Sequence, residues 1–421
     1  MNLLSQFTHI PILQLDAFGI KDLSAISTFK NLQDLDISDY GIIVSSKGDP
    51  LDISIICNLP YLRKLSIRDI KVTNTALFST MIQLEHLKLF HVDLCDVSVL
   101  SPLVNLVDLH LDGNPIRDIK ALKTLKKLKS FKLRTDYSYL IDTDPLVNLI
   151  NLVELEIYGY KISGKSFTSS LPCLKSLSLI ENKISDLTPL QSLTNLEHLN
   201  ISGNDITDIS ALSNLIKLKT LDLGSNDIKD ISGLQYLVEL TKLDLDSNRV
   251  VDISPLAGLE RLKELIVSSN QIRDCDALRG LVDLRELRIF NNRIERIEPL
   301  NNLRKLQTLE LYYNEISDIS PLASLIELRK LELSDNIISN VSALSSLVKL
   351  NTLNLESNCI EDITPLYTLT SLSELTITSN EISTLWPLTY LPKLVYLKCP
   401  ASCMLDKKPL TILTKNGVKL H

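Results

Sequence analysis

Aromatic residues, glycine and long apolar runs are scarce in this chain of 421 residues. Aromatic side chains make up 5% of the sequence, with a single Trp, and glycine occurs only 12 times. No run of about 18 apolar residues occurs, so the sequence predicts no membrane-spanning helix. The first residues, MNLLSQFTHIPILQL, lack a basic start and an uninterrupted apolar core, which argues against a secretory signal. We therefore expect a cytoplasmic protein, with export as the less favoured alternative.

Cysteine usage and net charge narrow the class of protein further. The seven cysteines are odd in number and dispersed, and only Cys399 and Cys403 are close, which favours a reducing compartment. The formal charge of −7 and pI of about 5.5 argue against a general nucleic-acid binder. The basic segment from Ile119 to Arg134 leaves nuclear import or an acidic partner as open alternatives.

Asparagine, in contrast, recurs at every 22nd residue, ten times in succession. The frame LxxLxLxxNxIxDIxPLxxL returns around each copy, as in ELTKLDLDSNRVVDISPLAGL. Ten copies in register indicate a repeat architecture. The repeated residues are Asn182, Asn204, Asn226, Asn248, Asn270, Asn292, Asn314, Asn336, Asn358 and Asn380.

The repeat extends in weaker form towards both ends of the chain. Upstream, it is interrupted by an eight-residue insertion near IVSSKGDP and a two-residue insertion within DYSYLIDTDPL. Downstream, Ser402 takes the Asn slot, and Pro409 and Leu410 fall where the PL of the frame belongs. The upstream slots are filled by Phe18, Tyr40, Ile70, Val92, Asn114, Asp136 and Tyr160. This spacing predicts about 18 coils in one continuous solenoid domain.

Three stretches of that solenoid differ in regularity. We expect irregular repeats over residues 1–160, regular 22-residue repeats over 161–402, and a last partial repeat with the C-terminal end over 403–421. The end, DKKPLTILTKNGVKLH, contains no conventional cap. A partner, another copy of the chain or a short terminal strand at NGVKL remain alternatives for covering it.

Each coil has a simple physical interpretation. In LxxLxLxx the apolar residues alternate, which predicts a short strand with Leu199 and Ile201 pointing inward and His198 and Asn200 outward. The following NxIxDIxPL is too short for a full helix, and Ser254 before a proline suggests a capping hydroxyl and a 3₁₀-like turn. The fold class predicted is an α/β repeat solenoid, a right-handed arc with a concave parallel β-sheet and 3₁₀-like turns on its convex side.

The Asn and Asp columns have a structural interpretation. Backbone groups in turns buried between coils need hydrogen-bond partners, and an Asn amide both donates and accepts. We therefore expect an Asn ladder that satisfies the turns above and below each side chain. The Asp column, exemplified by Asp208 and Asp252, is interpreted as turn chemistry rather than metal binding.

These motifs resemble the leucine-rich repeat superfamily, in its 22-residue class. DISPL and NxIxDI look most like internalin-type repeats, and the class also includes the leucine-rich regulator of type 1 protein phosphatase. The resemblance implies a platform for protein partners. In contrast to secreted internalins, we expect no signal peptide, immunoglobulin-like domain or cell-wall anchor. Phosphatase regulators more often carry IENL than DISPL in the turn.

The outward strand positions predict where a partner binds. Phe290 and Tyr312 share one column on adjacent coils, with Tyr313 beside them, and aromatic and Arg clusters are typical of binding hot spots. Charged candidates in the same region are Arg288, Glu310, Glu332, Asp244 and Asp246. A second, weaker patch consists of His86, Phe90, His110 and Tyr158.

Catalytic chemistry is not expected. No glycine-rich phosphate loop, HExxH or paired CxxC occurs. His86, Asp108 and Ser130 form one column, but a triad needs its base between nucleophile and carboxylate, and here Asp108 is in the middle. His86, Asp108 and His110, with Asp112, are explained by a polar rim as well as by a metal site. We predict no metal, no cofactor and no enzyme, but a scaffold or regulatory subunit; the alternatives are a surface adhesin and a type 1 phosphatase regulator. The oligomeric state stays open.

Overall fold

The structure is a computed structural model that describes residues 9–16, 23–39, 50–135, 139–163, 171–405 and 407–420. It divides into two compact units, Met1–Asp205 and Ile206–His421, each a stack of similar coils. The slot residues Phe18, Tyr40 and Asp136, and most of the first insertion, lie outside the described residues.

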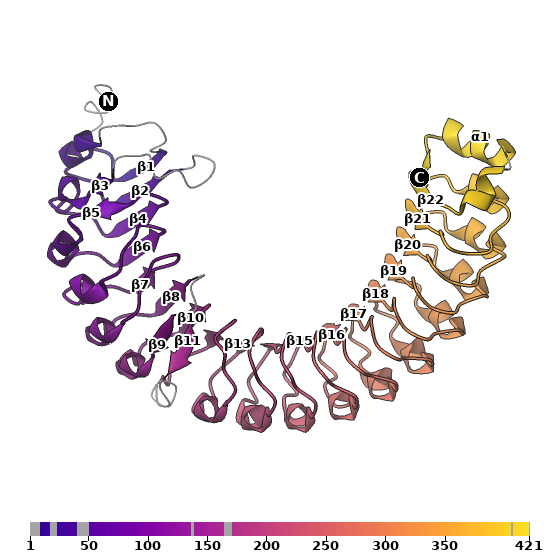
Figure 1. Cartoon of the computed structure of the whole chain (residues 1–421), viewed down its shortest axis with the longest axis horizontal. Helices are drawn as coiled ribbons and strands as arrows, with labels where there is room; N and C mark the ends of the chain where they lie inside the picture. The colour runs from indigo at the N-terminus through magenta and orange to yellow at the C-terminus, as the bar shows by residue number, and fades with distance from the viewer. Residues whose placement is uncertain are drawn as a thin grey trace. The chain divides into compact units, whose positions relative to one another are not determined.

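One coil is a short parallel strand followed by a 3₁₀ helix, as the alternation and the turn residues predict. In each unit the strands line the concave side and the 3₁₀ helices the convex side (Figure 1). The sheet of the first unit contains β1 (Ile12–Asp16), β2 (Asp34–Ser38), β4 (Lys64–Arg68), β6 (His86–Phe90), β7 (Asp108–His110), β8 (Ser130–Arg134), β10 (Glu154–Tyr158), β12 (Ser176–Ser178) and β13 (His198–Asn200). That of the second contains β14 (Thr220–Asp222), β15 (Lys242–Asp244), β16 (Glu264–Ile266), β17 (Glu286–Arg288), β18 (Thr308–Glu310), β19 (Lys330–Glu332), β20 (Thr352–Asn354), β21 (Glu374–Thr376), β22 (Tyr396–Lys398) and β23 (Lys419–Leu420).

The remaining elements lie outside the sheet strands just named. Two small parallel pairs are β3 (Leu51–Asp52) with β5 (Val72–Thr73), and β9 (Leu140–Asp142) with β11 (Lys161–Ser163). In the described part of the first unit, the 3₁₀ helices are η2 (Ser24–Thr28), η3 (Ile53–Ile55), η4 (Thr75–Thr80), η5 (Val97–Leu100), η6 (Lys120–Thr124), η7 (Asp144–Asn148) and η9 (Thr188–Ser192). Those of the second are η10 (Ser210–Asn214), η11 (Ser232–Tyr236), η12 (Ser254–Leu256), η13 (Asp276–Gly280), η14 (Glu298–Asn302), η15 (Ser320–Ser324), η16 (Ser342–Ser346), η17 (Thr364–Thr368), η18 (Trp386–Tyr390) and η19 (Ala401–Leu405), followed by the α-helix α1 (Lys407–Lys415).

The strand register follows the spacing of the repeat. Leu243 pairs with Leu265, which is the equivalent residue of the next coil, and such columns are buried. Asp34 on β2 pairs with Lys64 on β4, so the chain between them spans one repeat plus the first insertion. The second insertion lies in the same way between the paired strands β8 and β10. Both insertions therefore leave the sheet continuous through β10.

Where the column holds an Asp, the turn after the strand is capped differently from the sequence prediction. The carboxylate of Asp252, not the hydroxyl of Ser254, is the capping group, because Asp252 Oδ1 accepts the Ser254 backbone N–H at 2.8 Å. The same bond recurs at Asp208 and Asp318. An Asp two residues before the 3₁₀ turn forms an Asx turn, which competes well with a serine cap. The Asp column is thus turn chemistry.

The C-terminal end has a cap of its own. Pro409 and Leu410, expected in a 3₁₀ turn, lie in α1, and the short strand expected at NGVKL is β23, which pairs in parallel with β22. Leu413 and Val418 are buried at this end. No helix in the described ranges is long and apolar enough to cross a membrane.

Candidate protein-binding surfaces

The Asn ladder fixes the backbone beneath the concave face. The Asn248 amide nitrogen donates to the Leu223 and Leu245 carbonyls at 3.0 and 3.1 Å, and its Oδ1 accepts the Ile228 N–H at 3.0 Å. Similar bonds recur along the column as far as Asn380. Each side chain joins its own coil to the preceding one. The buried amides therefore set the positions of outward residues without facing a partner.

The main candidate site is an aromatic cluster in the second unit, made of Phe290, Tyr312 and Tyr313. Phe290 follows β17 and Tyr312 follows β18, so the ladder register sets the two rings side by side. Their centroids are 4.1 Å apart with planes 10° from parallel, and the Tyr312 and Tyr313 rings meet edge to face at 5.9 Å. Tyr313 is 57% exposed. The three rings together form an apolar surface on the strand side that a partner protein can contact.

Tyr313 also has an unusual backbone. Its φ is +52°, in the left-handed region that bulky residues rarely adopt. The equivalent residues of the neighbouring coils, Asn291 and Asp335, are of types that tolerate this conformation. The repeat imposes this conformation at the same position of other coils, including His91 and Glu181, and it costs more at a bulky residue than at Asn or Asp.

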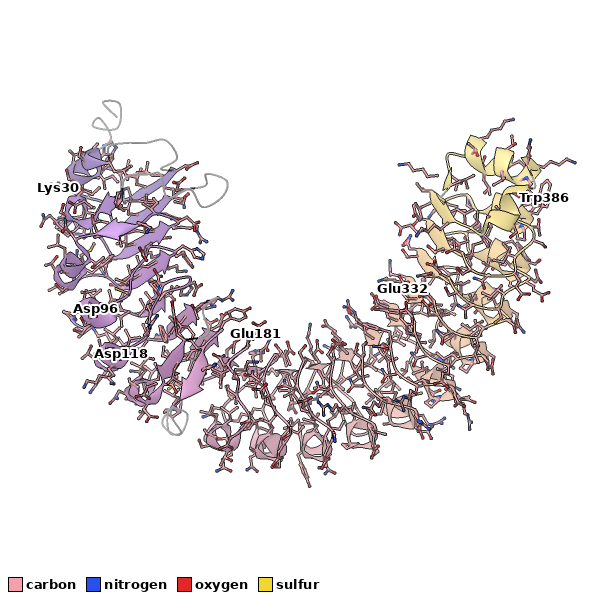
Figure 2. The ribbon with its side chains drawn as sticks, in the orientation of Figure 1. Lys30, Asp96, Asp118, Glu181, Glu332 and Trp386 are labelled. Carbon is pink, nitrogen blue, oxygen red and sulfur yellow. The ribbon has the colours of Figure 1, made fainter. Side chains whose placement is uncertain are left out.

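Charged side chains lie beside the aromatic cluster. Glu310 is only 7% exposed, and its carboxylate lies 2.8 Å from Lys330 Nζ and 3.6 Å from Arg288 Nε. Arg288 also pairs with Glu286 at 2.7 Å. Burial works against the charge of Lys330, but the Glu310 hydrogen bond and charge raise the pKa of its ammonium. Glu332, 3.6 Å from Lys330, lies on the concave side of the unit (Figure 2).

Asp244 and Asp246 form the acidic end of this surface. Burial and the neighbouring charges of Asp222 and Asp246 raise the pKa of Asp244 to about 6, although its Oδ1 accepts the Asp246 N–H at 2.8 Å. Asp246 Oδ1 is buried without a hydrogen-bond partner. Concentrated negative charge of this kind favours a basic partner group.

Sequence reasoning missed two residues between the acidic end and the aromatic cluster. Ile266 is a half-buried apolar side chain at an outward position of β16, and Ser268 is fully buried although its column points outward. Ile266 pairs in register with Arg288. The sequence signal for Ile266 is the apolar residue at an outward position of the segment KELIVSSN.

The second patch lies in the first unit and is more polar. Phe90 meets His110 edge to face at 6.2 Å, and the Arg68 guanidinium lies 4.0 Å from the Phe90 ring centre. Tyr158 is on β10 and donates a hydrogen bond to Glu181 at 3.0 Å. His86 is on β6, opposite Asp108, so β6 and β7 bring three of the four predicted residues together.

Comparison with known proteins identifies the family. The sequence model of the leucine-rich repeat region matches residues 169–412. The chain belongs to the leucine-rich repeat superfamily. An internalin (inlF) structure from Listeria monocytogenes is 30% identical, with a TM-score of 0.56, over 80% of this chain and 85% of that one. No curated protein matches the chain.

Two further structures share the leucine-rich repeat fold. A Leptospira interrogans leucine-rich repeat protein, 24% identical with a TM-score of 0.75, covers 100% of this chain and 98% of that one. The plant peptide hormone receptor RGFR1, in complex with RGF2, is 18% identical with a TM-score of 0.66, over 89% of this chain and 70% of that one. At these identities the likeness shows the fold alone.

In this leucine-rich repeat protein, the column of His86, Asp108 and Ser130 has the strand order that the sequence predicts. Asp108 lies between His86 and Ser130 in the strand register. Its carboxylate is 3.0 Å from His110 Nε2 and 3.6 Å from His86 Nδ1. Burial opposes ionisation, but the His110 contact and Lys88 hold the pKa of Asp108 well below its usual range. In the described part of the chain, no three His, Cys, Asp or Glu side chains are arranged to hold a metal.

Proposed function

We propose that this leucine-rich repeat protein is a non-enzymatic scaffold or regulatory subunit that binds a partner protein through the concave face of its second unit. The observation that carries the proposal is the Phe290–Tyr312 stack at 4.1 Å, on the strand side beside exposed Tyr313. Aromatic side chains dominate binding energy at interfaces because they bury a large area at low entropic cost.

The surroundings of the aromatic cluster favour a partner with apolar and basic groups. Asp244 and Asp246 make no ion pair among the residues that the structure describes, whereas Glu310 is compensated by Lys330. An apolar side chain of the partner would rest on Phe290 and Tyr312, and a Lys or Arg side chain would meet Asp244. Complementary charge would orient the partner as it approaches.

Affinity capture from lysate tests the proposal. The bait is the full chain, compared with Phe290→Ala/Tyr312→Ala/Tyr313→Ala and with a control, Tyr236→Ala/Tyr367→Ala/Tyr390→Ala, which removes three exposed tyrosines from η11, η17 and η18. We expect one protein to be lost by the cluster variant and retained by the control, with binding then reproduced using that purified protein. Capture of the same set by all three baits would contradict this site.

The alternative function is a surface adhesin. It is favoured by the 30% identity to the internalin structure over most of both chains. We favour an intracellular location instead, because seven dispersed cysteines suit a reducing compartment. Labelling intact source cells with a membrane-impermeant reagent distinguishes the two, since only an exported chain would be labelled before lysis.

A further inference from the structure

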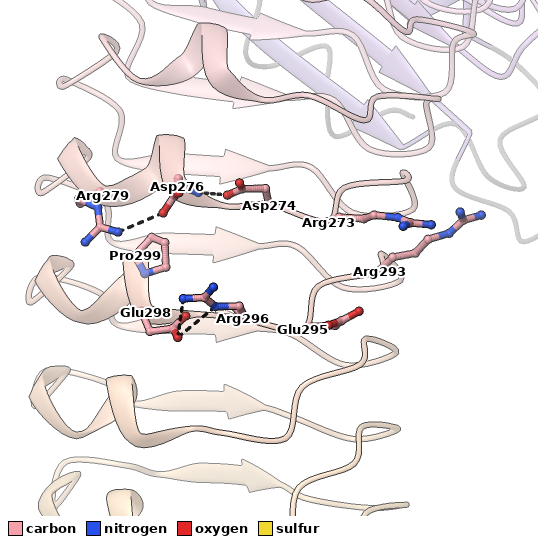
Figure 3. A pocket seen from close by; sticks show the side chains of 9 residues that line it. All are labelled: Arg273, Asp274, Asp276, Arg279, Arg293, Glu295, Arg296, Glu298 and Pro299. Carbon is pink, nitrogen blue, oxygen red and sulfur yellow. Dashed lines mark hydrogen bonds and ion pairs between the residues drawn. The ribbon is translucent and has the colours of Figure 1, made fainter.

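A charged groove separates the coils of η13 and η14 in the second unit. It has a volume of about 250 Å³ and is lined by Arg273, Asp274, Asp276, Arg279, Arg293, Glu295, Arg296, Glu298 and Pro299 (Figure 3). Arg296 occupies the position at which neighbouring coils carry Asp274 and Asp318, so one link of the Asp column is replaced by a cation. Four arginines and four carboxylates line the groove, so the placement of these charges, not their sum, decides what it can bind.

Most of the charge in the groove is compensated internally. Arg279 pairs with Asp276 at 3.0 Å, and Arg296 pairs with Glu298 at 3.2 Å. Asp274 is engaged as a cap, because its Oδ1 accepts the Asp276 N–H at 2.7 Å. These contacts occupy the half of the groove that is nearer to the 3₁₀ helices (Figure 3).

The other half holds two arginines that are not ion-paired and one carboxylate, Glu295. Arg273 and Arg293 extend from adjacent coils towards the same end of the groove (Figure 3), and neither makes an ion pair among the residues that the structure describes. Arg249 shares the repeat position of Arg293 and pairs with Asp227, so a partner within the solenoid is available at this position elsewhere. Glu295 lines the same half and leaves a net charge of +1 there.

We propose that Arg273 and Arg293 form a site for a phosphate group. Guanidinium forks match the oxygens of phosphate, and a tetrahedral anion accepts from two of them at once. A phosphate group has enough acceptor oxygens to engage both guanidinium groups, whereas a carboxylate has two oxygens and is matched by one guanidinium fork. The phosphate is either free in solution or carried by a phosphorylated side chain of a bound protein. Glu295 opposes the anion and sets a modest affinity.

Titration of the full chain tests the site. Inorganic phosphate is followed by ³¹P NMR at about pH 7.5 and low ionic strength, where screening of exposed charges is weakest. We expect Arg273→Gln/Arg293→Gln to weaken binding by about tenfold or more, since each lost guanidinium removes a charge-assisted hydrogen bond. Glu295→Gln should strengthen binding several-fold. Arg304→Gln/Arg329→Gln changes the net charge equally outside the groove and should leave binding unchanged.

A peptide arm distinguishes the two sources of phosphate. A phosphoserine peptide, its serine form and its glutamate form are titrated into the same proteins. Tighter binding of the phosphoserine peptide than of inorganic phosphate assigns the site to a phosphorylated protein, and equal binding assigns it to free phosphate. The proposal is overturned if wild type and Arg273→Gln/Arg293→Gln bind phosphate with equal affinity. It is also overturned if the glutamate peptide binds wild type as tightly as the phosphoserine peptide does. The exposed substitutions should keep the unfolding midpoint, and the aromatic cluster is untouched, so this test is independent of the proposed partner site.

Discussion

In the regular coils a single buried Asn amide holds each turn, so replacing it is expected to destabilise the coils that it joins. Asn248→Ala leaves the Ile228 N–H without its acceptor and removes one of the two Asn amides that donate to the Leu223 carbonyl, the other being Asn226. Because an unsatisfied buried N–H is costly, we expect a loss of about 1–3 kcal/mol in the free energy of unfolding. Urea unfolding measures it, with Asn302→Ala, an exposed Asn at the end of η14, as the control. An unchanged midpoint for Asn248→Ala would argue against the ladder.

We expect Tyr313 to lower the free energy of unfolding and to strengthen partner binding. Asn tolerates a φ of +52° better than Tyr does, so Tyr313→Asn should raise the free energy of unfolding by about 0.5–1 kcal/mol. The same change removes an exposed ring from the aromatic cluster and should weaken partner capture. Thermal unfolding and capture are measured together, with Ser357→Asn as the control at the equivalent position. A destabilised Tyr313→Asn would show that its ring packing outweighs the backbone strain.

Asp244 makes stability depend on pH. Its folded-state pKa is raised to about 6, mainly by burial, so its contribution to stability is present at pH values below its ordinary pKa. That contribution is lost as the pH rises through about 6. We expect Asp244→Asn to lose less stability than wild type between about pH 4.5 and pH 7.5, as measured by urea unfolding. Parallel pH profiles for the two proteins would mean that Asp244 ionises normally.

At the scale of elements, the C-terminal cap should protect the last coils. Leu413 of α1 is 1% exposed, and the helix contacts η18. Leu413→Ala should lower the local free energy of unfolding of the C-terminal cap by about 2–5 kcal/mol and expose the end of the sheet. Hydrogen exchange should become faster in β21 and β22 than in β17, while Leu410→Ala, at a less buried position of the same helix, should have a smaller effect. Uniform protection in Leu413→Ala would mean that the cap is dispensable.

Repetition explains which elements could be predicted. The strand and 3₁₀ turn of each coil follow from alternation and turn residues that recur in register, and the shared column of Phe290 and Tyr312 gives their contact. The helix α1 occurs once, so analogy with the repeat misplaces its Pro409–Leu410 in a 3₁₀ turn, whereas the burial of Leu413 favours a helix there. The left-handed φ of Tyr313 and the burial of Glu310 depend on packing between coils, which residue types alone do not give.

For the whole molecule, stability should differ along the chain, because each coil of a solenoid is supported only by its neighbours. The first unit carries one insertion between β2 and β4 and another between β8 and β10, whereas β14 to β22 repeat without insertion. Irregular coils lose Asn-ladder bonds, as at Val92, where the slot holds no amide. We therefore expect amides of β4 and β6 to exchange with solvent before those of β17 and β18. As a control, exchange is repeated at increasing denaturant concentration. The amides of β4 and β6 should become fully exchangeable at a lower concentration than those of β17 and β18. Exchange in the opposite order would mean that the ladder does not dominate coil stability, and that the aromatic cluster lies in the more labile part of the chain.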